Sequence, residues 1–313
     1  MQSLSKKPVL NVRWSFTVVL AMILVAPVVC GAMESEHTNS NEPGPVPLVV
    51  PPWTGPQQSL ASRLGLRSHA VDIGPEVYHF KYEEPGVMEE KGMFYGVCFG
   101  LTSRDWVSNQ RETSEPDGGG MFRAEGRVAF GDVDYDGMLM VGTPYKVSGM
   151  DDLAAEGRLL LGQDWLAFEA LSTLYAGVGY RYLNDNLAPD PAGYERESNY
   201  LYIPLGYNFD SGQGIGWAFG FGAEFDVFVF GRQESHLSDL DPMLLDVDND
   251  QDSGYGYRAS IKLKHKSRDA IFTFEPFFRY WDIDKSDRDD TYHAFVEPAN
   301  ETTEYGIQLI WMF

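Results

Sequence analysis

The chain has 313 residues and a formal net charge of −22, which argues against nucleic-acid binding because phosphates are bound by lysine and arginine. Aromatic residues make up 14% of the sequence and there are 32 glycines, a composition that favours β-structure. Two cysteines, Cys30 and Cys98, are too few for a disulfide framework or a zinc site.

The N-terminal segment has the layout of a secretory signal peptide. Basic residues precede an apolar run from Phe16 to Val29, and the small residues of CGAM follow. We therefore expect a signal peptide over residues 1–32, cleaved after Ala32. Two alternatives stay open, namely an uncleaved anchor helix and lipidation of Cys30.

Residues 33–73 have the composition of a linker. The stretch NEPGPVPLVVPPWTGP is rich in proline, which blocks helices and strand ladders and favours extended conformations. We expect a disordered periplasmic linker here. Beyond it, no segment resembles an apolar helix of about 20 residues, so a membrane-spanning form of the remaining chain would have to be a closed barrel.

From residue 74 onward, segments with alternating apolar and polar residues are separated by turn sequences. Alternate side chains of a strand point to opposite faces. One face carries large apolar side chains, beginning with Tyr78, Phe80 and Tyr82 in the first strand and Tyr95, Val97, Phe99 and Leu101 in the second. The opposite faces carry glycine and charged residues. A membrane barrel explains this pattern, with the apolar faces toward lipid and the charged faces toward the lumen.

The turns support the same architecture. Tight turns at 210–214 and 265–269 alternate with longer loops near 136–150, 184–195, 232–252 and 284–300. Short turns on one side and long loops on the other, with an even number of strands, are typical of bacterial outer-membrane barrels. The sequence thus predicts an all-β, antiparallel transmembrane β-barrel of about 10 strands over residues 74–313.

The predicted lumen is highly charged. The motif AEGR occurs at 124–127 and again at 155–158. The charged residues predicted to face the lumen are Arg123, Glu125, Arg127, Glu156, Arg158, Arg181, Glu224, Asp226, Arg258, Lys262, Glu275 and Arg279. Both signs are interleaved, so the charges can pair, and a barrel of about ten strands is near the size that side chains fill. We expect a largely closed lumen, with a narrow passage as the alternative.

The C-terminal segment EYGIQLIWMF places Tyr305, Ile307, Leu309, Trp311 and Phe313 on one strand face. It resembles the C-terminal recognition signal of bacterial outer-membrane barrels. The segments FKYEEPGVMEEKGMFYGV and YERESNYLYIPLGYNF are also similar to a set of uncharacterised outer-membrane β-barrel proteins. The resemblance implies insertion by the barrel-assembly machinery into the outer membrane of a diderm bacterium, among lipid and lipopolysaccharide. It implies no activity.

The loop DVDNDQDSGYG places Asp246, Asp248 and Asp250 at alternate positions, as a calcium loop begins. Gln251 stands where such a loop needs glycine, and Tyr257 where it needs glutamate. We expect a solvated acidic loop, with a weak divalent-cation site as the alternative. Such acidic loops could also bind Ca²⁺ or Mg²⁺ that bridges to lipopolysaccharide.

An enzymatic function has little support in the sequence. The omptin surface proteases are also ten-stranded barrels and use an acidic pair and an Asp-x-His pair near the rim. Asp132, Asp134 and Asp136 could supply the acidic pair, but the chain contains no Asp-x-His, and His236 and His293 do not fit this pattern. We expect a non-enzymatic barrel without cofactor, with a structural or surface-interaction role. A small diffusion channel is the alternative, and an omptin-like protease is a remote one.

Overall fold

The structure is a computed structural model that describes residues 66–104, 106–107, 118–138, 142–167, 169–212, 215–288 and 295–313. The predicted signal peptide, and the predicted linker up to residue 65, lie outside the described residues. No helix in the described ranges is long and apolar enough to cross a membrane.

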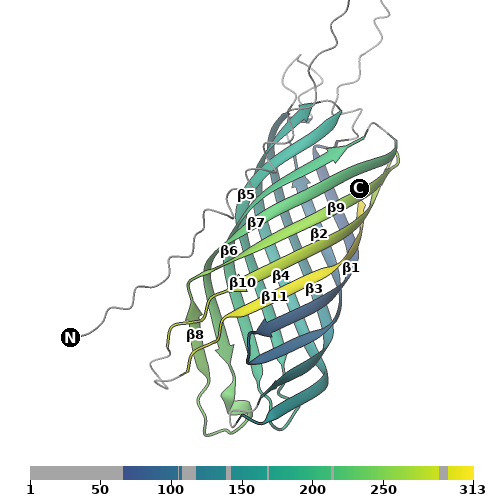
Figure 1. Cartoon of the computed structure of the whole chain (residues 1–313). Coiled ribbons are helices and arrows are strands. Elements are labelled where there is room, and N and C mark those ends of the chain that lie inside the picture. Colours follow the sequence, from purple (N-terminus) through teal and green to yellow (C-terminus); the bar gives the residue numbers. More distant parts are fainter. Residues whose placement is uncertain are drawn as a thin grey trace, which may run out of the picture. The chain divides into compact units, whose positions relative to one another are not determined.

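The described residues form eleven strands and one short 3₁₀ turn, and the strands pair antiparallel (Figure 1). In chain order these elements are β1 (His69–Glu84), β2 (Met88–Ser103), β3 (Gly118–Met138), β4 (Pro144–Ala167), β5 (Ala170–Asn186), β6 (Glu195–Ser211), β7 (Gly216–Ser235), η1 (Leu237–Asp239), β8 (Val247–Gln251), β9 (Gly254–Lys266), β10 (Ile271–Ile283) and β11 (Asn300–Met312).

The sheet closes into a barrel because β1 pairs with β11 and β6 pairs with β7. β8 and β9 lie one after the other along the same edge of β7, where Gly231 pairs with Gln251 and Val227 pairs with Tyr255. They therefore act as one interrupted strand, and the wall is a closed antiparallel barrel of ten strands, as the sequence predicts.

The two ends of the barrel differ. At one end, called here the terminus end, β1 begins and β11 finishes, and the amide of Phe313 donates to the Val71 carbonyl at 2.9 Å. The short connections from β4 to β5, from β6 to β7 and from β9 to β10 lie at this end. The opposite end, called here the loop end, carries the connection from β7 to β8 with η1 and the connection from β10 to β11.

The outer wall carries an apolar belt, which confirms the predicted outward faces of most strands. Tyr95 in β2 is 61% exposed and Trp217 in β7 is 67% exposed, and apolar side chains at alternate positions of the other strands are also exposed. Closer to the loop end the outward residues become polar, as at Asp132 in β3, Glu197 in β6 and Glu234 in β7. An apolar band bounded by polar residues is typical of barrels that face lipid.

The predicted orientation of the first strand is wrong. The side chains of Tyr78, Phe80 and Tyr82 are buried inside the barrel rather than on its outer wall. Toward the loop end the outward positions of β1 are polar, as at His79 and Lys81, so the apolar residues that alternate with them point inward rather than toward lipid. Tyr78 stacks on Phe94 with their ring centroids 5.3 Å apart, and this aromatic packing fills the interior.

Two predicted boundaries also differ from the structure. β1 begins at His69, within the range assigned to the linker, and its Asp72 faces inward and binds Arg123 at 2.7 Å. β3 and β4 remain paired as far as Met138 and Pro144, inside the predicted loop 136–150. Backbone pairing continues beyond the apolar belt. The outward residues there are polar, so the sequence no longer shows the alternation of apolar and polar residues from which a strand is predicted.

Candidate functional site: the charged interior of the barrel

The structure brings the predicted lumenal charges together on the inner wall. All twelve side chains lie within 4.0 Å of an oppositely charged group, so none of them is left as an isolated buried charge. Pairing of this kind offsets the large desolvation cost of ionised groups inside a protein. The AEGR repeat contributes directly, because Glu125 pairs with Arg158 and Arg127 pairs with Glu156 across β3 and β4.

Glu304 is the centre of one half of this network. Its carboxylate on β11 accepts hydrogen bonds from Arg127 at 3.1 Å, from Arg181 at 3.1 Å and from Arg279 at 3.0 Å. Glu76 on β1 lies beside it, 3.3 Å from Arg279 and 3.6 Å from Arg127. The sequence prediction missed both glutamates. Glu304 could have been found, because it directly precedes Tyr305, whose side chain points outward, and must therefore point inward.

Arg258 on β9 is the centre of the other half. Its guanidinium lies 2.9 Å from Glu156 on β4, 2.8 Å from Asp226 and 3.0 Å from Glu224 on β7. Arg158 reaches Glu224 as well, so the network connects opposite walls of the barrel. Charge-assisted hydrogen bonds across the interior fix the relative positions of strands that are not neighbours in the sheet.

Aromatic side chains fill the interior toward the loop end. This aromatic layer consists of Tyr78, Tyr200, Tyr202 and Trp281, each less than 2% exposed. Arginines of the network lie against these rings, with Arg181 5.7 Å from the ring centroid of Trp281 and Arg258 5.4 Å from that of Tyr202. Cation–π contact and close packing stabilise this layer.

A cavity of about 240 Å³ lies on the other side of the network, toward the terminus end. Charged groups of both signs line it, among them Asp72, Arg123, Lys262, Lys264 and Glu275. Its lining reaches the network arginines but does not include Tyr200, Tyr202 or Trp281 of the aromatic layer. The cavity is therefore separated from the loop end by the network and the aromatic layer.

A second charged cluster, which the sequence analysis missed, lies at the loop end. Arg196 contacts Glu84 at 2.6 Å, Asp185 at 2.7 Å, Glu90 at 3.2 Å and Glu297 at 4.0 Å. Burial raises the pKa of Glu297 to about 8. The parity of β6 could have revealed this cluster, because Arg196 has the parity opposite to the outward residues of that strand.

Asp152 adds a further carboxylate to the cluster around Arg196. Its donor atom and those of Glu90 and Asp185 all lie within 4.8 Å of one another. Carboxylates therefore outnumber the single arginine in this part of the barrel.

The aspartates of the acidic loop have different surroundings. Asp248 and Asp250 lie on β8, an extended strand, and Asp250 binds Arg232 at 3.2 Å. Asp246 precedes this strand and accepts a hydrogen bond from the Ser238 amide at 3.0 Å. A weak divalent-cation site at these three residues stays a prediction.

The predicted barrel-assembly signal and the candidate acidic pair of a protease both lie on the outer wall. Tyr305, Ile307, Leu309, Trp311 and Phe313 share the outer face of β11 and its C-terminal residue. Asp132 and Asp134 are exposed on the outer face of β3 rather than directed into the barrel. His293 lies outside the described residues.

Comparison with known proteins shows a likeness of fold. No protein-family model matches the chain, and no curated protein matches it. Among solved structures, it is similar to the outer membrane protease OmpT from Escherichia coli, with a TM-score of 0.56 and 12% identity over 78% of this chain and 96% of that one. Neisserial surface protein A is also similar, with a TM-score of 0.32 and 9% identity, over 78% of this chain and 96% of that one. The likeness to OmpT, at 12% identity, shows the fold alone, which is that of an outer-membrane barrel.

Proposed function

We propose that this chain is a closed, non-enzymatic barrel of the outer membrane, which acts through its loop end rather than by passing solutes. The observation that carries the proposal is the aromatic layer beneath the loop end, in which Tyr78, Tyr200, Tyr202 and Trp281 are almost fully buried. Arg181 fills space in the same layer and is 0% exposed. A lumen filled by side chains in one half does not provide a continuous water channel.

The apolar belt and the C-terminal strand support the location. We place the apolar belt in lipid, the terminus end toward the periplasm, and the loop end toward the lipopolysaccharide and the exterior. The outward residues of β11 would be the signal that the barrel-assembly machinery recognises. At the loop end Met243 is 89% exposed next to the exposed Leu244, and exposed apolar residues at a tip are suited to contact with a partner.

A small diffusion channel is the second candidate function. The cavity of about 240 Å³ favours it, because a charged, hollow half-barrel needs only a rearrangement of the aromatic layer to become a passage. In such a channel Arg127, Arg158 and Arg258 would select among ions.

Single-channel recording separates the two functions. We expect purified full-length protein, shown to be folded by heat-modifiable migration on a gel, to give no conductance steps in a planar bilayer. A Trp281→Ala variant, which removes the largest ring of the aromatic layer, should conduct more often than the wild type if that layer closes the lumen. Steady steps in the wild type that change when Arg258 is replaced by Gln would overturn the closed-barrel proposal in favour of the channel.

A further inference from the structure

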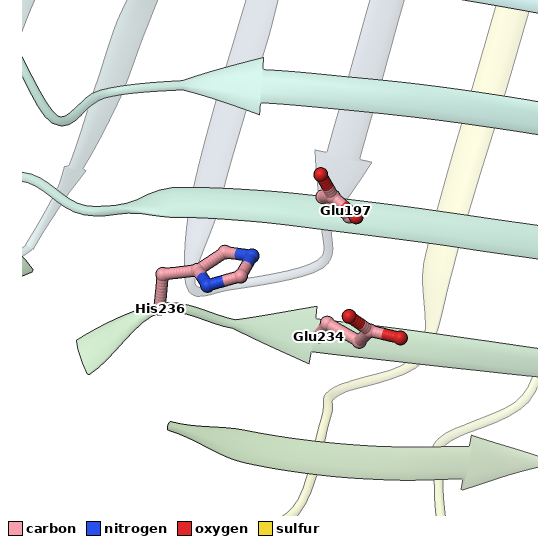
Figure 2. A group of neighbouring side chains, drawn as sticks. All are labelled: Glu197, Glu234 and His236. Carbon is pink, nitrogen blue, oxygen red and sulfur yellow. The ribbon is translucent and has the colours of Figure 1, made fainter. Parts of the chain in front are cut away.

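Three side chains with metal-binding atoms meet on the outer wall at the loop end. Glu197 lies on β6, Glu234 lies on the neighbouring β7, and His236 is the first residue after β7 (Figure 2). One donor atom from each of the three lies within 4.8 Å of the other two. The group is on the polar side of the apolar belt and is separate from the interior network.

The two glutamates are in an unfavourable position unless a cation lies between them. Glu197 and Glu234 are direct partners in the register of β6 and β7, and Asp248 of β8 is the partner of Glu234 on its other side. Like charges directly opposite each other destabilise a sheet. Two residues earlier on β7, Arg232 is paired with Asp250 of β8 and compensates its charge. At the level of Glu234 all three paired positions across β6, β7 and β8 are acidic, so no basic residue there compensates them.

His236 is oriented as a metal ligand would be. Its Nδ1 lies 3.7 Å from the Asp246 carboxylate, which is itself fixed by the Ser238 amide at 3.0 Å. Its Nε2 is buried and has no hydrogen-bond partner among the described residues. A carboxylate at one imidazole nitrogen, with the other nitrogen left for the metal, is the usual arrangement around a ligating histidine.

The side chain of Glu197 is also held in place from outside the group of three. The hydroxyl of Tyr182 on β5 donates to Glu197 Oε1 at 2.9 Å. Outer contacts of this kind orient carboxylate ligands and are part of a metal site.

We propose that Glu197, Glu234 and His236 bind a divalent transition-metal ion of the Zn²⁺ class on the outer wall of the barrel. One imidazole nitrogen and two carboxylates form a donor set that suits Zn²⁺, with a fourth position left for water or an external ligand. Zn–N and Zn–O bonds of about 2.0–2.2 Å require the three donors to approach more closely. Rotation of the flexible glutamate side chains supplies this movement while the strands stay in place.

Metal titration of the full-length protein tests the proposal. We expect chelator-treated protein in detergent to bind one Zn²⁺ at this site in a calorimetric titration. His236→Gln and Glu234→Gln should each weaken binding by more than about 10-fold, and Asp246→Asn by about 10-fold through loss of the histidine's orientation. With Cu²⁺ as the probe, the electron paramagnetic resonance spectrum should show coupling to one imidazole nitrogen, and this coupling should vanish in His236→Gln.

Two matched variants control for general effects of substitution. Glu195→Gln changes a glutamate on the same face of β6, and His265→Gln changes an exposed histidine at the terminus end; neither should change the affinity. Retained affinity for Zn²⁺ in both His236→Gln and Glu234→Gln would overturn the proposal, and so would the absence of stoichiometric binding in folded wild-type protein. Either result would mean that His236 serves only as an ion-pair partner of Asp246.

Discussion

Glu304 is the single residue on which the interior network depends most. It is 0% exposed, and Arg127, Arg181 and Arg279 from three other strands share its carboxylate. Arg181 has few other polar contacts, since two of its three guanidinium nitrogens are buried without a hydrogen-bond partner. Removal of one partner from a buried ion pair leaves an uncompensated charge, which costs more than the pair itself contributes.

We therefore expect Glu304→Gln to lower the free energy of unfolding by about 3–5 kcal/mol, because three guanidinium groups lose their shared anion. Denaturant unfolding in lipid vesicles, followed by tryptophan fluorescence, measures the change. Glu301→Gln is the matched control, since Glu301 lies on the same strand with its side chain on the outer wall. A loss below about 1 kcal/mol for Glu304→Gln would show that the network is easily rearranged.

At the scale of elements, the seam between β1 and β11 is where the chain closes on itself. Gly306 on β11 is paired with Tyr78 on β1. A Cβ atom at Gly306 would lie 2.2 Å from the Val77 carbonyl oxygen and 2.4 Å from the Cβ of Tyr78. Only glycine allows β1 to approach so closely while Tyr78 points into the interior.

Gly306→Ala should consequently destabilise the closed barrel by about 1–3 kcal/mol, the usual cost of overpacking. The fraction of folded barrel on a heat-modifiable gel and the midpoint of denaturant unfolding report the effect. Gly157→Ala provides the comparison, because a Cβ at Gly157 on β4 meets no atom within 4 Å. Equal behaviour of the two variants would contradict the close approach at the seam.

At the scale of the whole molecule, the two ends of the barrel differ in how their charges are balanced. The network around Glu304 and Arg258 combines arginines with a similar number of carboxylates, whereas the cluster at the loop end places Arg196 among several acids. Burial raises the pKa of Glu297, which lies in the connection between β10 and β11, to about 8, well above the usual value of about 4 for carboxylic acids.

The stability of the loop end should therefore fall as the pH rises. A carboxylic acid whose pKa is higher in the folded state contributes its full stabilisation below about pH 4 and loses it as the pH rises to about 8. Hydrogen exchange of amides near Glu297, at the loop end of β10 and β11, corrected for intrinsic rates, should be faster at pH 9 than at pH 5.

The substitution Glu297→Gln should reduce the pH dependence of exchange at the loop end, because it removes the titrating group. Glu301→Gln, which changes a glutamate on the outer wall of β11, should leave the dependence unchanged. Exchange that is independent of pH in the wild type would show that this carboxyl group does not titrate in this range.

The sequence contained most of the information about the strands and their faces. Alternation identified the barrel and placed all twelve of the predicted lumenal charges on the inner wall, because side-chain direction along a strand depends only on neighbouring residues. It failed at Tyr78, Phe80 and Tyr82, because the outward positions between them, His79 and Lys81, are polar and the apolar face of this part of β1 is the inner one. It also missed Asp72, because a proline-rich composition suggested that the linker continued through it.

The sequence by itself determined the all-β class, the outward apolar belt and the alternation of charges that predicts an interior network. The tertiary structure alone decided which charges meet, because those partners are distant in the chain: Arg127 and Glu304 are separated by 177 positions. It also decided that a cavity lies toward the terminus end while buried aromatic rings lie toward the loop end, and that Glu197, Glu234 and His236 converge on the outer wall. These features follow from the closure of the barrel and the register of its strands, which are set by long-range backbone pairing and not by local residue patterns.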